Sequence, residues 1–117
     1  MADPDVIDRS ALDGLLDSVG GDKEFLAELL QTYFADAPKL FETMRAALAA
    51  GSADEFRRAA HSLKSNSASF GAMLLSRMSK ELEDMGKAGT LDGAGPKIAQ
   101  AEEEYARVRA ALESAAC

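Results

Sequence analysis

The stretch AHSLKSNSASFGA, residues 60–72, decides how the chain is organised, and it contains the only histidine, His61. Upstream, Ser52 and Glu55 have the spacing of a capping box, which predicts a helix over about residues 53–71. At about 100° per residue, one face of this helix carries only apolar or small side chains. We expect that face to be buried, and it consists of Phe56, Ala59, Ala60, Leu63, Asn66, Ser67 and Phe70.

His61 lies about 160° from Leu63 on the same helical wheel, so its imidazole is expected to face solvent. An exposed histidine alone indicates nothing, because polar residues normally cover a surface. The pattern around it is more informative, because its helical neighbours are cationic or small and leave the ring open to approach. These neighbours are Arg57, Arg58, Lys64, Ser65 and Ala68.

The pattern Ala-His-x-Leu-Lys, followed by small residues and then Phe-Gly-Ala, resembles the signature of the histidine-containing phosphotransfer (HPt) domain of two-component phosphorelays. The resemblance extends from about Val6 to Leu112 in helix lengths and apolar spacing. Two positions depart from the commonest form of the motif. Ser65 stands where glycine is frequent and Asn66 stands where serine is frequent, and both replacements are small.

The resemblance implies that His61 is the phospho-acceptor. Lys64, one turn further on, is the best-placed cation for stabilising a phosphoryl group by a charge-assisted hydrogen bond. By the same resemblance, Glu83 in the following helix stands where HPt domains often have the Glu or Gln that orients the imidazole. An alternative for Glu83 is a solvated helix charge paired with Lys80 or Lys87.

Charge is unevenly distributed along the chain. With 13 Lys/Arg and 20 Asp/Glu the net charge is −7, which argues against a general nucleic-acid binder. Residues 56–80, however, contain five Lys/Arg and no acid. We expect this basic segment to dock an anionic partner through Arg57, Arg58, Ser65 and Ala68. The alternative is a chance excess of cations on a solvated face.

Composition favours one helical domain, residues 1–117, with its core over about residues 6–113. The β-branched residues are scarce, with three Thr, three Val and two Ile. No apolar run approaches the ~20 residues that span a bilayer, and no short apolar segment follows a basic start, so we expect no signal peptide. The lone cysteine, Cys117, excludes an internal disulfide and favours the cytoplasm. One histidine and one cysteine cannot make a zinc site.

Capping residues predict five helices. Asp8 and Asp22 cap the first two, and Pro38 lies inside the second, which we expect to be one bent helix. The fourth carries Leu74, Leu75, Met78, Leu82 and Met85 at core spacing and ends at Gly89. A loop over residues 90–95 precedes the last helix, with Pro96 in its first turn. The expected fold is all-α: an antiparallel up-and-down four-helix bundle with a short N-terminal capping helix.

No P-loop, no GxGxxG and no acidic cluster near His61 is present, so we expect a phosphocarrier, not an enzyme that uses ATP. The resemblance implies partners with receiver domains, in a response regulator or a hybrid histidine kinase, and places Mg²⁺ in the receiver, leaving this chain without a cofactor of its own. We expect a monomer that binds neither nucleic acid nor membrane. The alternative function is a non-phosphorylated helical adaptor that uses the same basic face. Whether the chain is free-standing or a piece of a hybrid kinase stays open.

Overall fold

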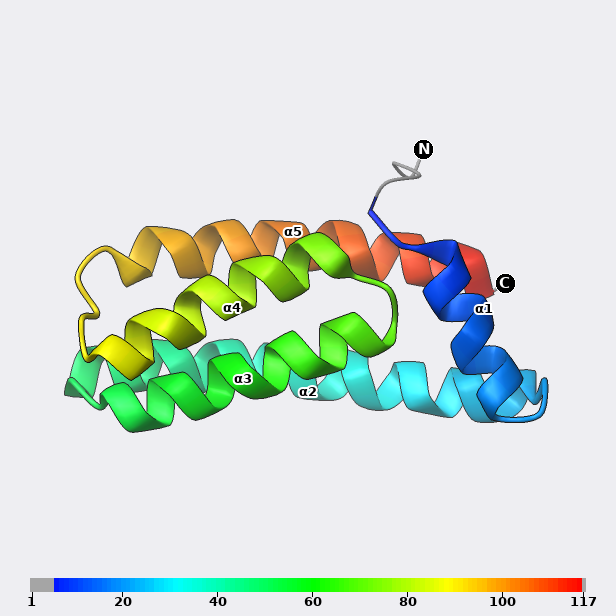
Figure 1. Ribbon diagram of the computed structural model, residues 1–117, viewed down its shortest axis with the longest axis horizontal. Helices are drawn as coiled ribbons and strands as arrows, with labels where there is room; N and C mark the ends of the chain where they lie inside the picture. The colour runs from blue at the N-terminus through cyan, green and yellow to red at the C-terminus, as the bar shows by residue number, and fades with distance from the viewer. Residues whose placement is uncertain (1–5, 117) are drawn as a thin grey trace.

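The computed structural model describes residues 6–116 and is helical throughout, without a strand in that range. The helices are α1 (Arg9–Ser18), α2 (Lys23–Ala50), α3 (Ala53–Ser69), α4 (Met73–Ala88) and α5 (Ala94–Ala116). Helices α2 to α5 alternate in direction, and short turns join them (Figure 1). Each packs against two others, because α2 contacts α3, α3 contacts α4, α4 contacts α5 and α5 contacts α2.

The short helix α1 lies across one end of this bundle and contacts α2 and α3 (Figure 1). Its attachment is close, because the Asp8 amide donates a hydrogen bond of 2.8 Å to the Gly71 carbonyl. Gly71 has a φ of +80°, and a Cβ there would lie 2.5 Å from the Asp8 carbonyl oxygen. The predicted all-α four-helix bundle with an N-terminal capping helix is therefore confirmed.

Most helix ends follow the predicted caps. The Asp8 side chain accepts from the Ser10 amide, and the Asp22 side chain accepts from the Phe25 amide. The capping box at Ser52 is wrong in its chemistry, although α3 does begin at Ala53: Ser52 makes no side-chain cap hydrogen bond. In the tight turn after α2 the Ser52 amide donates to the Ala47 carbonyl at 2.8 Å, so it is not free for the Glu55 side chain, which is the other half of a capping box.

The two prolines inside helices are accommodated differently. Helix α2 is continuous over 28 residues through Pro38, so the prediction of a single helix here is confirmed. Helix α5 begins at Ala94, so the last two residues of the predicted loop belong to the helix. Pro96 is then its third residue, still within the first turn, where an amide has no partner in the helix.

The core contains most of the predicted apolar residues, but the buried face of α4 is rotated about the helix axis relative to the predicted one. Leu74, expected in the core, is 43 % exposed. The buried residues of α4 are Leu75, Ser79, Leu82, Glu83 and Gly86. Two of these are polar, and Ser79 is satisfied by donating to the Leu75 carbonyl at 2.8 Å. The rotation turns Glu83 toward α3. Within residues 6–116, no helix is long and apolar enough to cross a membrane.

Candidate functional site

The imidazole of His61 stands on the outer face of α3, as the helical wheel predicts. Its side chain is 55 % exposed. Two neighbours on the opposite side of the helix, Ala60 and Leu63, are fully buried in the core. These buried neighbours fix the rotation of α3, so the histidine is held at the surface by a rigid helix and not by a loop.

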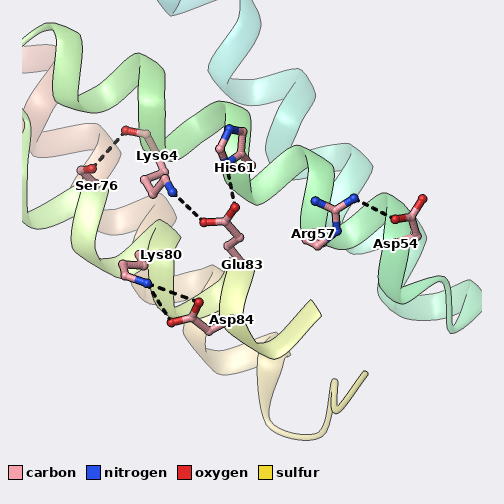
Figure 2. A network of polar contacts seen from close by, with 8 residues as sticks. All are labelled: Asp54, Arg57, His61, Lys64, Ser76, Lys80, Glu83 and Asp84. Atoms are coloured by element: carbon pink, nitrogen blue, oxygen red, sulfur yellow. Dashed lines mark hydrogen bonds and ion pairs between the residues drawn. The ribbon is translucent and has the colours of Figure 1, made fainter. Parts of the chain in front are cut away.

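Glu83 reaches from α4 to two side chains of α3 at once (Figure 2). The His61 Nδ1 and Glu83 Oε2 atoms are 2.6 Å apart, and Lys64 Nζ donates to Glu83 Oε1 at 2.7 Å. The carboxylate itself is buried, with only 2 % of the residue exposed. The alternative pairing of Glu83 with Lys80 is wrong, because Lys80 pairs with Asp84 at 3.3 Å.

The charge state of Glu83 follows from these contacts. The hydrogen bond from Lys64 lowers the pKa of the Glu83 carboxyl to about 2, against the opposing effect of burial, and the hydrogen bond from His61 adds to the lowering. An ionised carboxylate only accepts hydrogen bonds, so Nδ1 of His61 must be the donor. The neutral ring therefore carries its proton on Nδ1 and its lone pair on Nε2, which makes Nε2 the nucleophilic atom.

The cations of the basic segment lie closer to acidic side chains in the structure than the sequence indicates. Asp54, just before the segment, binds Arg57 at 2.9 Å and Arg58 at 2.6 Å. Lys64 and Lys80 bind Glu83 and Asp84, which lie just after it. The acid-free interval thus begins only two residues after Asp54. Beyond its other end, α4 brings Glu83 back against α3, and Asp84 pairs with Lys80 on α4 itself. The field around His61 is correspondingly weaker than the sequence indicates.

A groove of about 490 Å³ opens beside His61, between α2 and α3. The residues that line it are Asp36, Lys39, Leu40, His61, Ser62, Ser65 and Asn66. The three from α2 were not predicted to lie near His61, and Leu40 among them is half-buried. Nothing in the sequence indicates which part of α2 lies opposite His61.

The remaining predicted positions divide between this surface and the core. Ser65 is exposed in the groove and Ala68 is half-buried outside it. Asn66, expected on the buried face of the helix, is half-buried and lines the groove instead. Ser67 does bond across the bundle, with its hydroxyl 2.9 Å from the Tyr33 hydroxyl. Among the described residues no group of three or more His, Cys, Asp or Glu side chains is arranged to hold a metal ion.

In this helical bundle a buried carboxylate contacts both an exposed imidazole and a lysine, which is the arrangement that the resemblance to histidine phosphotransfer domains implies. The family model of the Hpt domain matches residues 28–111 of the chain. The chain belongs to the Hpt domain family. Its role is therefore histidine phosphotransfer in a phosphorelay. Members of this family are phosphocarriers and not classical enzymes. In phosphorelays, Hpt domains interact with receiver domains and hybrid kinases.

Two solved structures are similar over almost their whole length. Histidine-containing phosphotransfer protein B (HptB) of Pseudomonas aeruginosa PAO1 has a TM-score of 0.88 and 32% identity, covering 97% of this chain and 96% of that one. The HPT domain of the Hpt sensor hybrid histidine kinase from Shewanella has a TM-score of 0.73 and 20% identity, covering 97% and 95%, and shows the fold alone. No curated protein sequence matched the chain.

Proposed function

We propose that His61 is the residue that carries the phosphoryl group, with Nε2 as the acceptor atom. The observation that carries this proposal is the double hydrogen bond of the buried Glu83 carboxylate to His61 and Lys64. It fixes the tautomer and the ring orientation of an exposed imidazole, which a surface histidine without a function does not need.

The transfer step follows from that tautomer. The Nε2 lone pair attacks the phosphorus of an aspartyl phosphate on the partner, the Nε2–P bond forms, and the bond from phosphorus to the aspartate oxygen breaks. The aspartate leaves as a carboxylate and keeps the electron pair of the broken bond. The ring becomes a phosphoimidazolium that retains its proton on Nδ1. Glu83, ionised and 2.6 Å from Nδ1, stabilises the positive charge that develops on the ring.

Lys64 is the residue we assign to the phosphoryl oxygens. Its ammonium lies one turn from His61 and is held in place by Glu83 Oε1 at 2.7 Å. The side chain is 27 % exposed, so part of the ammonium remains accessible to an incoming anion. A charge-assisted hydrogen bond of this kind contributes about 1.5–3 kcal/mol before solvent screening.

The partner's receiver domain supplies the remaining chemistry in this proposal. We place Mg²⁺ there because both oxygens of Glu83, the carboxylate that contacts His61, are already engaged by His61 and Lys64. The docking surface comprises Arg57, Arg58, Ser65 and Ala68 together with the groove beside His61. We further propose that residues 1–117 act as one monomeric domain in the cytoplasm, without an ATP site or a cofactor of their own.

The test is to mix the protein with a phosphorylated receiver and Mg²⁺ and look for acid-labile, base-stable phosphohistidine at His61. His61→Gln is the control, and it is expected to abolish labelling. Because the His61 side chain is exposed, the melting temperature of the His61→Gln variant is expected to lie within about 5 °C of that of the unmutated protein. For a protein of this size, that difference corresponds to ~1 kcal/mol. Binding to receivers without any labelling of the unmutated protein would favour the adaptor instead.

A further inference from the structure

Gly86 lies where α4 closely approaches α3 beside the site. It is buried in α4, three residues after Glu83. A Cβ built on it would lie 2.8 Å from the Arg57 Cβ, 2.9 Å from its Cα and 3.0 Å from its amide nitrogen. These atoms belong to the backbone and first side-chain carbon of α3, so they cannot swing aside. Only a residue without a side chain fits this contact.

Backbone conformation gives no other reason for this glycine. The φ of Gly86 lies outside the left-handed region, unlike that of Gly89, which ends the helix. Inside a helix glycine is less favourable than alanine. The other two glycines within helices are free of such contact: Gly14 has no atom within 4 Å of a built Cβ, and Gly95 meets only a Leu48 side-chain carbon at 4.0 Å.

The Gly86 contact is one of two that flank Glu83 along α4. Arg57 precedes His61 by one turn on α3 (Figure 2). Gly86 packs against Arg57, so it sets the helix spacing on that side of the site. On the other side, the Ser76 hydroxyl donates to the Lys64 carbonyl at 3.0 Å. Glu83 reaches across between these two points. A small separation of the two helices is enough to break this hydrogen bond. The His61 Nδ1–Glu83 Oε2 distance is 2.6 Å, and lengthening it by about 1 Å takes it beyond hydrogen-bond range.

We propose that Gly86 is a positioning residue: the absence of a side chain there lets α4 lie close enough for Glu83 to hold the His61 ring. The effect on transfer rests on the proposed function of His61, whereas the effect on the ring does not. A methyl group at residue 86 pushes the two helices apart, separates Glu83 from Nδ1 and frees the imidazole to exchange tautomers.

The test compares Gly86→Ala and Gly86→Val with the matched variants Gly14→Ala and Gly95→Ala. In the unphosphorylated protein, ¹⁵N NMR of the His61 ring reports which nitrogen carries the proton. We expect the bias toward Nδ1–H to fall in both Gly86 variants, more in the valine variant, and to persist in the matched variants. Transfer from a phosphorylated receiver is expected to slow by about tenfold or more for the alanine variant, since small misplacements of reacting groups are costly.

A second variant covers the case in which the Gly86 variants do not fold. Glu83→Asp shortens the reach by one methylene without touching the helix contact, and it is expected to lose the same tautomer bias. An unchanged bias in a folded Gly86→Ala protein, or in Glu83→Asp, overturns the proposal. If the unmutated protein takes no phosphoryl group, the function proposed for His61 fails, and the NMR comparison still decides the role of Gly86.

Discussion

Two buried glutamates, Glu83 on α4 and Glu104 on α5, are both only 2 % exposed, but their carboxylates differ in hydrogen-bond partners. Glu83 has both oxygens engaged by side chains of another helix. Glu104 accepts one hydrogen bond, from Arg107 Nε on its own helix at 2.9 Å, and within residues 6–116 its Oε2 has no partner. Burial of a carboxylate therefore does not by itself mark a functional site. What distinguishes Glu83 is that its partners include an exposed imidazole, that of His61.

The strongest way to break this comparison is to replace each glutamate by methionine, which has a similar volume. Glu83→Met is expected to lower the phosphotransfer rate by about 100-fold, because the imidazole loses the group that orients it. Glu104→Met is expected to leave transfer unchanged and to raise the free energy of unfolding by about 1 kcal/mol or more, because it removes an incompletely satisfied buried polar group. Rapid-quench transfer and urea unfolding measure the two effects, and equal transfer rates for both variants would remove the distinction.

A second prediction concerns Lys64, one of the two hydrogen-bond partners of Glu83. Lys64→Ala is expected to slow transfer by about tenfold and to shorten the lifetime of the phosphorylated protein, because one charge-assisted hydrogen bond is lost. Lys80→Ala is the matched control, since Lys80 also pairs with an acid, Asp84, but is 60 % exposed. A Lys64 variant with the rate and lifetime of the Lys80 variant would make Lys64 a solvated charge only.

Acid titration tests how much the ionised Glu83 contributes to stability. The pKa of Glu83 is lowered from 4.5 to about 2, so its ionised form stabilises the fold fully above pH 4.5, and the contribution is lost as the pH falls toward 2. We expect the free energy of unfolding to fall over this range by on the order of 1 kcal/mol more in the unmutated protein than in Glu83→Gln, after allowing for solvent screening. Urea unfolding at several pH values between 6 and 2 tests this, and parallel curves would contradict it.

The smallest expected effect concerns ionic strength. Because Asp54 binds both Arg57 and Arg58, we expect the second-order transfer constant to fall only a few-fold between low and high salt. Asp54→Asn releases both arginines and is expected to steepen this dependence. Stopped-flow transfer at two salt concentrations decides the matter, and an unchanged slope in the Asp54 variant would show that the arginines do not face the partner.

Local chemistry made most of the fold predictable. Asp8, Asp22 and Gly89 mark helix ends through contacts within a few residues, and the apolar period of α3 places His61 outward without reference to any other helix. The failure on α4 involves a contact between elements. Leu74 and Glu83 lie on one helix, and only packing against α3 decides which of them is buried.

The site was predictable to a similar limit. His61, Lys64 and Glu83 are brought together as expected, yet the sequence could not show that one carboxylate binds both of the others. The charge of the basic segment was also overestimated. Asp54 and Asp84 lie just outside residues 56–80 and pair with cations of the segment, so a count within these residues omits them. The α2 side of the groove was missed because Asp36, Lys39 and Leu40 have no sequence feature that relates them to His61.

The three-residue turn between α3 and α4 has a consequence for the order of folding. Arg57, His61, Lys64, Glu83 and Gly86 all belong to this one helical hairpin, and the hydrogen bond between His61 and Glu83 spans only 22 positions of the chain. Closing so short a loop costs little chain entropy, and local contacts of this kind form fast. We therefore expect the geometry around the imidazole to assemble before α1 docks and to survive when α1 transiently detaches.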